Sequence, residues 1–508
     1  MSVAVSVLGL SIICNNLMTV LVFVATFLLT WWYTQPENVT KLPPGPFPWP
    51  IFGNIFSLAP TEEDNSGAQR LWEMTRYYGS DIISVKFGAK RAIVVHKYSD
   101  IKRISDEFVH VNKEGANSLF LPGIIGVDGL RWKEQRRFAL SFLRDFGFGK
   151  SRAQDIAQTE IKAAIAELDK SSGHPYNPEV LLKNMVSNVI AALVFGHRFE
   201  YNDKSYVKYL NMEEEILECF RFVIYGYLVP AFIRDRLPRD MFRIKEFKQK
   251  HAEMEEAIFR NEVRDHMANY TAGACNDYID YFIKTMKEHE GVEKEHWFNE
   301  RQLVDNIVDF FRAGTDTSAA TLRWVFLRMA TNPEIQKRVK EEIMETIGAD
   351  QPPSIQDKPK MPFTETTIIE CMRFHPILPL IQTRHTPDEP VKFKDFVLPP
   401  RTLIVENIHA LHHDPDEWDE PDTFNPERFI GPNGKVIKDN HMLQFGSGKR
   451  ECLGQPLAKM VIFLFLIGIL QKFTIKISHG NEVEAMLKNR VGNIVNVPLS
   501  YDVVFTRD

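Results

Sequence analysis

The chain has 508 residues, of which 44% are hydrophobic and 25% are charged, and its formal net charge is −6. This length accommodates one large domain or several ordinary ones. Because no internal repeat or low-complexity block divides the chain, we expect one large domain behind an N-terminal extension. The slightly acidic balance argues against nucleic acid as the main partner.

The five cysteines are odd in number and show no C-x-x-C pair or regular spacing. They are typical of reduced cytosolic thiols, and they argue against a disulfide framework or a zinc site. They are Cys14, Cys219, Cys275, Cys371 and Cys452.

Residues 3–33 carry no charged side chain, and the part from Leu17 onward is the most apolar stretch of the chain. A helix over residues 17–33 would be about 25 Å long, close to the hydrocarbon core of a membrane at about 30 Å. The aromatic residues at 31–33 suit the membrane interface. We therefore expect a transmembrane anchor over residues 1–33. A cleaved signal peptide is the alternative, although the stretch is long for one and lacks a basic start.

Residues 34–54 form a connector rich in Pro and Gly, which includes the run KLPPGPFPWPIFGN from Lys41. Such a segment is rigid and non-helical, so we interpret it as a spacer that holds the body close to a membrane. A plain linker is the alternative. Because Lys41 is the only early cation, the charge pattern says little about membrane orientation. The remaining residues, 55–508, are predicted to form the main domain.

The first part of this domain contains a predicted hairpin, followed by a basic helix and then by mostly amphipathic helix over residues 146–271. The basic helix places Trp132 and Arg136 at positions i and i+4, on one helical face. An indole N–H and a guanidinium so placed could bind an anionic group together. Surface packing is the alternative. The predicted strands are residues 82–87, 91–95, 391–398, 402–407 and 490–497.

Residues 301–331 are predicted to form one long helix, with the run AGTDT in its middle. Ala313 and Gly314 would let a flat ligand approach the backbone, and glycine there costs about 1 kcal/mol of helix propensity. Asp316 and Thr317 place an acid beside a hydroxyl, which can disturb the helical hydrogen bonds and hold water. A kinked helix with a solvated aspartate is the alternative.

Glu370 and Arg373 lie three residues apart and face the same way on a helix that Pro376 would end. Arg428 follows later, in the loop run Pro-Glu-Arg-Phe, and Arg384 is a further candidate cation. A surface ion pair would contribute under about 1 kcal/mol. A buried cluster of Glu370, Arg373 and Arg428 would instead be a structural lock, because loss of one member leaves charge unpaired.

The most informative stretch has the spacing F-x-x-G-x-R-x-C-x-G, formed by Phe445, Gly448, Arg450, Cys452 and Gly454. The glycines allow a tight turn and the close approach of a large planar ligand. Backbone N–H groups at the start of the apolar helix that follows would stabilise a thiolate and lower its pKa. A thiolate can bind iron, and the neighbouring guanidinium suits a haem propionate. A buried structural cysteine is the alternative.

Together these segments resemble the cytochrome P-450 family, and within it the microsomal branch of drug- and steroid-metabolising enzymes. The resemblance runs from the uncharged N-terminal segment to the C-terminus. It implies a mainly α fold with a small β region, a triangular prism of helices around haem b, behind an N-terminal membrane anchor. It rests on Trp132-x-x-x-Arg136, AGTDT from Ala313, Glu370-x-x-Arg373, Pro426-Glu427-Arg428-Phe429 and the cysteine motif, in that order.

The resemblance also implies a role for each motif residue. Cys452 would be the axial ligand of the haem iron. Asp316 and Thr317 would organise water for proton delivery, while Glu370, Arg373 and Arg428 would be structural. The residues expected to bind the haem and its propionates are Trp132, Arg136, Arg384, Arg450, Phe445, Gly448, Gly454 and Ala313.

The implied reaction inserts one oxygen atom from O2 into a lipophilic substrate, such as a steroid, fatty acid or xenobiotic, and reduces the other to water. Electrons would come from NADPH through a separate flavoprotein reductase, because the chain has no Gly-rich dinucleotide turn in a βαβ setting. Cytochrome b5 is a further candidate partner. The implied location is the endoplasmic reticulum membrane, with the catalytic domain facing the cytosol. Lys133, Arg136, Arg137, Lys449 and Lys459 would form a basic docking face.

Two other functions stay open. A haem-thiolate isomerase or dehydratase would rearrange peroxides without oxygen or a reductase, and it would not need the pair Asp316 and Thr317. A non-enzymatic haem sensor or carrier has no reason to retain both proton-delivery groups and a reductase face. The pocket segments that the resemblance implies are largely apolar, which indicates a lipophilic substrate without choosing among its classes.

Overall fold

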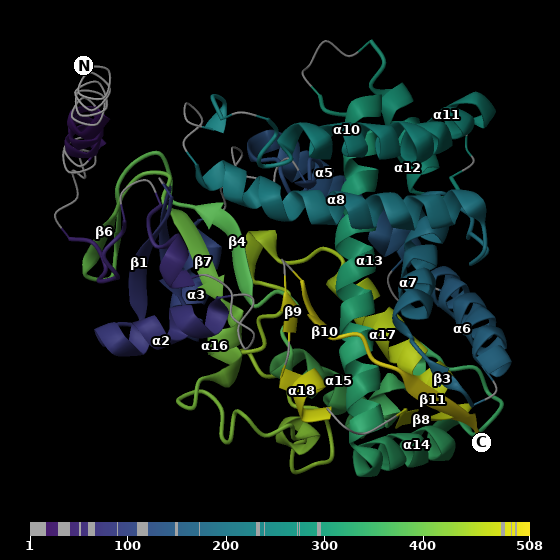
Figure 1. Cartoon of the computed structure of the whole chain (residues 1–508). Coiled ribbons are helices and arrows are strands. Elements are labelled where there is room, and N and C mark those ends of the chain that lie inside the picture. The colour runs from purple at the N-terminus through teal and green to yellow at the C-terminus, as the bar shows by residue number, and fades with distance from the viewer. Residues whose placement is uncertain are drawn as a thin grey trace, which may run out of the picture.

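The protein is mainly α-helical with small sheets, as the sequence predicts (Figure 1). Its structure is a computed structural model. The residues that it describes are 17–28, 41–49, 52–58, 67–88, 90–108, 120–147, 151–171, 173–229, 234–237, 239–271, 273, 275–291, 296–478, 483–488, 490–492 and 495–508.

The helices carry most of the fold. They are α2 (Ala68–Tyr78), α3 (Tyr98–Glu107), α5 (Gly129–Phe142), α6 (Ser151–Ser171), α7 (Glu179–Val194), α8 (Lys204–Leu228), α10 (Ile244–Met254), α11 (Arg260–Asn269), α12 (Tyr278–Glu288), α13 (Glu300–Thr331), α14 (Pro333–Ile347), α15 (Pro362–Phe374), α16 (Ile408–His413), α17 (Gln455–Leu470) and α18 (Val483–Lys488). Short 3-10 turns lie at Ile55–Leu58, Ile355–Lys360, Pro426–Phe429 and Gly448–Arg450, and π-helical turns at Leu143–Gly147 and Glu255–Phe259.

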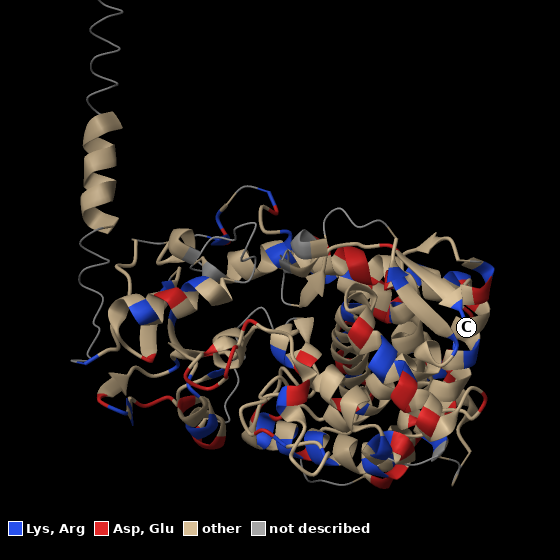
Figure 2. Cartoon of the chain, turned by 90° about the horizontal axis from the view of Figure 1, so that it is seen from below, with Lys and Arg blue, Asp and Glu red and all other residues tan. Residues whose placement is uncertain are grey.

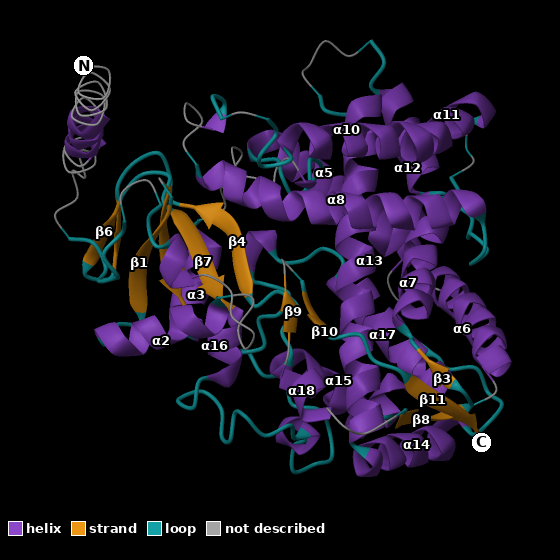
Figure 3. Ribbon diagram, viewed as in Figure 1, coloured by secondary structure: helices purple, strands orange, loops and turns teal. Residues whose placement is uncertain are grey.

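A four-stranded sheet lies to one side of the helices, as Figure 3 shows. Its order is β1 (Ile82–Phe87), β2 (Lys90–Val95), β7 (Leu403–Asn407) and β4 (Leu380–His385), and only the β2–β7 pair is parallel. Three smaller sheets pair β3 (Pro175–Tyr176) and β8 (Phe473–Ile477) with β11 (Val503–Arg507), β5 (Val391–Phe393) with β6 (Phe396–Leu398), and β9 (Arg490–Gly492) with β10 (Asn496–Pro498). The predicted hairpin over β1 and β2 is confirmed.

The prediction of a single strand over residues 391–398 is wrong. The chain turns back at Lys394, whose φ of 52° is left-handed, and the two halves pair as β5 and β6. The apolar residues on both sides of the turn fit either arrangement, so the sequence pattern alone does not reveal the reversal.

Helix α13 is the axis of the helical part, and α8 crosses it (Figure 1). Asn299 begins the helix by accepting a hydrogen bond from the backbone N–H of Gln302 at 2.9 Å, and Pro333 starts the next helix. Between Gln302 and Ala330 all residues of α13 are buried except Phe310, Ala313, Gly314, Asp316 and Thr317. Side-chain accessibility in the middle of so buried a helix indicates an internal space.

The predicted membrane anchor is described only in part. Residues 17–28 are helical, and their apolar side chains, such as Phe23 at 71% exposure, are largely accessible. Figure 2 shows no charged residue on this helix. The rest of the predicted anchor lies outside the described residues. Among the described helices, none combines the length and the apolar character that crossing a membrane requires.

We predict that the ion pair between α11 and α12 makes stability depend on pH. Burial lowers the pKa of His266, but hydrogen bonds with Asp277, at 3.1 Å, and with the Glu262 carbonyl outweigh it and raise the pKa to about 9. A raised histidine pKa stabilises the fold fully below the unfolded value of about 6.5, and this contribution is lost as the pH rises through about 9. The thermal midpoint of the wild type should therefore exceed that of His266→Gln at pH 6 and converge with it above pH 9. A difference that stays constant with pH would contradict this.

Candidate active site

The cysteine motif forms a turn that packs on α3. The backbone N–H of Cys452 donates to the carbonyl of Phe445 at 2.9 Å and closes the turn. Gly448 has a φ of 69°, and a Cβ there would lie 2.4 Å from the carbonyl oxygen of Ser105 in α3. The turn and α3 thus require glycine at position 448. At Gly454 a Cβ would lie 3.9 Å from the sulfur of Cys452, an ordinary contact.

The thiol of Cys452 faces an internal space. Cys452 has an accessible surface, yet enough protein surrounds the thiol for burial to raise its pKa. The N–H groups of Gly454 and Gln455 and the charge of Arg136 lower that pKa but do not outweigh burial. The N–H groups thus act in the expected direction, but burial, which the motif does not show, decides the net direction. A bound iron ion would supply the missing positive charge, since a coordinating thiol is deprotonated.

Three arginines converge beside this turn. Burial lowers the pKa of Arg450 to about 10, and repulsion from Arg136 and Arg384 adds to this effect even though Asp128 opposes it. Arg450 donates to Asp128 at 3.1 Å, and its guanidinium lies 3.9 Å from the ring centroid of the buried Trp132. The residues that the resemblance assigns to the haem propionates therefore lie close to one another. They are Trp132, Arg136, Arg384 and Arg450.

The other two arginines hold the backbone of the turn. Arg136 donates to the carbonyl of Glu451, and Arg384 donates to the carbonyl of Ser447 at 2.9 Å. Arg384 is 3% exposed and pairs with Glu406 at 3.1 Å, while its Nε has no hydrogen-bond partner among the described residues. A buried donor without a partner is costly. It is what an anionic ligand would satisfy.

The accessible residues of α13 form a stripe. Phe310, Ala313, Gly314 and Thr317 have the i, i+3, i+4, i+7 spacing of one helical face. The Thr317 hydroxyl donates to the carbonyl of Ala313 at 2.7 Å, so its oxygen can still accept from a ligand or water. Gly314 also lies close to α7, because a Cβ there would lie 2.9 Å from the end of the Ile190 side chain. Its missing side chain allows α7 and α13 to approach.

Asp316 lies beside the stripe and pairs with Lys183 of α7, Oδ1 to Nζ, at 3.2 Å. Burial opposes the charge of Lys183, but Asp316 and Glu213 raise its pKa. Sequence reasoning missed Lys183. The available signal was that it is the only cation in α7, a helix of mostly apolar residues.

An apolar cluster brings the three parts of the site together. Phe310 of α13 and Leu453, the residue after the cysteine, both pack against the cluster that contains Trp132 of α5. The cysteine turn, α5 and the accessible middle of α13 therefore share one neighbourhood.

Glu370, Arg373 and Arg428 also lie together. Arg373 donates twice to Glu370, at 2.8 and 2.9 Å, and both residues are fully buried. Arg428 adds a third bond to Glu370 at 3.2 Å. Arg373 also donates to the carbonyl of His412 at 2.6 Å, and the ring of His412 accepts from the backbone N–H of Leu443 at 3.3 Å. Burial lowers the pKa of His412 to about 3, so the ring is neutral and can accept. This chain of bonds ends two residues before Phe445.

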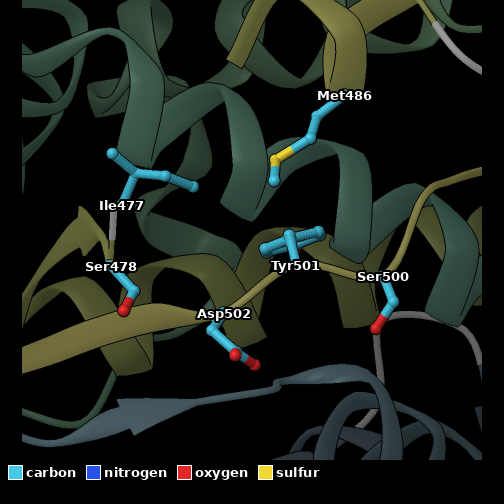
Figure 4. Close-up of a pocket in the computed structure, with 6 residues that line it drawn as sticks. All are labelled: Ile477, Ser478, Met486, Ser500, Tyr501 and Asp502. Atoms are coloured by element: carbon cyan, nitrogen blue, oxygen red, sulfur yellow. The ribbon is translucent and has the colours of Figure 1, made fainter. Parts of the chain in front are cut away.

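A separate pocket lies between β8, α18 and the residues that precede β11 (Figure 4). It is lined by Ile477, Ser478, Met486, Ser500, Tyr501 and Asp502. None of these is among the predicted site residues.

The comparisons with known proteins agree with this geometry. The family model "Cytochrome P450" matches residues 43–505. Among curated relatives, mouse cytochrome P450 2J5 is 33% identical over 96% of both chains. Chicken cytochrome P450 2H2 is 32% identical over 96% of this chain and 97% of its own length, and human cytochrome P450 2J2 is 32% identical over 95% of both chains.

The chain belongs to the cytochrome P450 family. It is therefore a haem-thiolate monooxygenase in the general sense. Two observations show that the residues of the site fit a cytochrome P450 haem. An accessible cysteine lies in an internal space, and three arginines converge there, of which Arg384 has donor atoms without a hydrogen-bond acceptor among the described residues.

We predict that Glu370→Gln lowers the free energy of unfolding by about 3–5 kcal/mol, because the fully buried guanidinium of Arg373 and the partly buried one of Arg428 lose their shared carboxylate. The matched control is Glu427→Gln, which removes a pair with Arg338 in which both side chains are about half exposed. It should cost under about 1 kcal/mol. Denaturant unfolding followed by circular dichroism measures both, and equal losses would show that burial of the cluster adds nothing.

Proposed function

We propose that this monooxygenase inserts one oxygen atom into a lipophilic organic molecule, a steroid, fatty acid or xenobiotic, with electrons from NADPH through a flavoprotein reductase. The accessible stripe on α13 carries the proposal, because it offers an apolar surface at Phe310 and Ala313 and a hydroxyl at Thr317 in the same internal space. Apolar lining with few polar groups suits a lipophilic ligand.

In this proposal Cys452 binds the haem iron, and the bound haem supplies the oxygen chemistry. Arg136, Arg384 and Arg450 hold the propionates, with Trp132 stacked beneath Arg450. Phe445, Gly448, Gly454 and Ala313 complete the surroundings of the haem. Glu370, Arg373 and Arg428 keep the cysteine turn in place through His412.

Proton delivery is assigned to Thr317 and Asp316. The Thr317 hydroxyl is anchored to the Ala313 carbonyl, which leaves its oxygen free to hold a water. Asp316 can exchange protons with water when it leaves Lys183, since both side chains are about one quarter exposed. This pair favours a monooxygenase over a haem-thiolate isomerase or dehydratase and over a non-enzymatic haem protein, which do not need it.

The reductase would dock on the cysteine side. Lys133 and Arg137 of α5 and Lys449 of the cysteine turn are exposed, and the bond from Arg136 to Glu451 joins these two elements. Such a face suits an acidic partner, the reductase or cytochrome b5. We also propose that residues 1–33 anchor the chain in the endoplasmic reticulum membrane, that 34–54 connect, and that 55–508 form the catalytic domain on the cytosolic side.

We expect the reduced wild-type protein with CO to absorb at the position typical of thiolate-ligated haem. Cys452→Ala should lose this band, because no other residue would supply the thiolate, and Cys275→Ala should keep it as the cysteine control. Absorption difference spectra measure both. A wild-type spectrum typical of histidine ligation would refute the assignment of Cys452.

We expect Thr317→Ala to bind haem normally but to release severalfold more peroxide per NADPH consumed, because water near the site is less well held. Thr321→Ala is the matched control, since its hydroxyl bonds the next turn of α13, at 2.9 Å from the Thr317 carbonyl. Peroxide and NADPH assays with a turnover substrate measure the coupling. If both variants keep wild-type coupling, Thr317 has no part in proton delivery.

A further inference from the structure

Arg312 is a buried arginine in the middle of α13, directly before Ala313, and it is 5% exposed. None of the roles proposed above uses it. A guanidinium in the interior is stable only when it is paired and hydrogen-bonded. The partners of the Arg312 guanidinium therefore show which elements it holds together.

All three nitrogens of the Arg312 guanidinium have a partner. Nε and Nη2 pair with the two carboxylate oxygens of Glu213 in α8, at 2.8 and 3.3 Å. Nη1 donates to the carbonyl of Phe120 at 2.7 Å, and the guanidinium carbon lies 4.5 Å from the centroid of the Phe120 ring. The Arg312 and Glu213 side chains are each 2% exposed. One side chain thus ties α8 and Phe120 to α13.

A second contact closes this arrangement. The Phe120 ring stacks on Phe220 of α8, with ring centroids 4.3 Å apart and planes 19° from parallel. Glu213 and Phe220 are seven residues apart and so share one face of α8. We call Arg312, Glu213, Phe120 and Phe220 the Arg312 clasp.

The chain after Phe120 is fastened to α13 as well. The carboxylate of Asp309 accepts from the backbone N–H groups of Gly123 at 3.1 Å and Ile125 at 2.7 Å. Asp309 and Arg312 flank Phe310 on α13, and Ala313 follows at once. The two attachments therefore border the accessible stripe, next to the proposed substrate space.

We propose that the Arg312 clasp sets the width of the substrate space and thereby makes Arg312 a residue that determines substrate size. The clasp fixes how far α8 and Phe120 stand from Phe310 and Ala313. Because Arg312 is buried and its guanidinium is bound to Glu213 and Phe120, it does not touch the substrate. It acts by holding α8 and Phe120, which would border the substrate space. This inference rests on the proposed function and deepens it, since it names a size limit for the lipophilic substrate.

The test compares variants that open the clasp with a matched arginine elsewhere on α13. The single variant Arg312→Leu would leave the carboxylate of Glu213 without its arginine partner. The double variant Arg312→Leu, Glu213→Leu removes both charges and is therefore measured beside it. The control is Arg323→Leu, which removes an α13 arginine that pairs with Glu179 of α7 at 2.8 Å and lies outside the clasp.

The first measurement uses the full-length holoprotein and two probes that bind the haem iron, imidazole and an imidazole carrying a triphenylmethyl group. Spectral titration gives the ratio of their dissociation constants. We expect both clasp variants to shift this ratio toward the bulky probe by about tenfold, within the range that loss of a buried pair allows. Arg323→Leu should keep the wild-type ratio. An unchanged ratio in both clasp variants would overturn the proposal.

The second measurement does not depend on haem chemistry. We expect amide hydrogen exchange in α8 and in residues 120–127 to be about tenfold faster in the double variant than in Arg323→Leu, because these elements are no longer fastened to α13. Equal exchange would overturn the proposal even if the probes bind differently. A wild type that shows no thiolate-haem spectrum would instead refute the proposed function, and the exchange comparison would still decide whether the clasp exists.

Discussion

The position of the cysteine turn depends on one buried carboxylate. Glu370 accepts hydrogen bonds from Arg373 and Arg428. Arg373 also donates to the carbonyl of His412, and the neutral ring of His412 accepts from the backbone N–H of Leu443. The turn that begins at Phe445 then docks on α3, where only glycine fits at 448. These bonds thus hold the backbone that leads into the cysteine turn. Because Glu370 and Arg373 are fully buried, each is stable only while the other is present.

The charged side chains around the central helix α13 lie close to charges of opposite sign. Arg312, Glu213, Lys183 and Asp316 alternate in sign across α13, α8 and α7, and Glu213 contributes to the raised pKa of Lys183. Such alternation lets four charged groups lie close to an internal space without leaving net charge there. The same helix presents its small residues and its threonine to that space. One helix therefore combines an apolar surface, the neighbouring acid and hydroxyl of Asp316 and Thr317, and the attachment of its neighbours.

Sequence reasoning succeeded where a residue's role depends on its local neighbours. The apolar helix α17 after the cysteine motif, the length of α13 and the hairpin of β1 and β2 follow from local sequence patterns. It failed where the decisive partner is distant in the chain. Nothing in AGTDT shows that Ile190 lies against Gly314. Burial, which outweighs the local N–H groups in setting the pKa of Cys452, is not visible in a motif either.

The sequence by itself determined the family, because the order and spacing of a few residue types, above all those around Cys452, place a candidate iron ligand, cations and an acid–alcohol pair in one chain. The tertiary structure alone decided how these groups are held. The chain from Glu370 to Leu443, the convergence of Arg136, Arg384 and Arg450, and the Arg312 clasp each join residues that are far apart in sequence. Such contacts depend on how the elements pack, and packing is set by all their faces at once rather than by any local pattern.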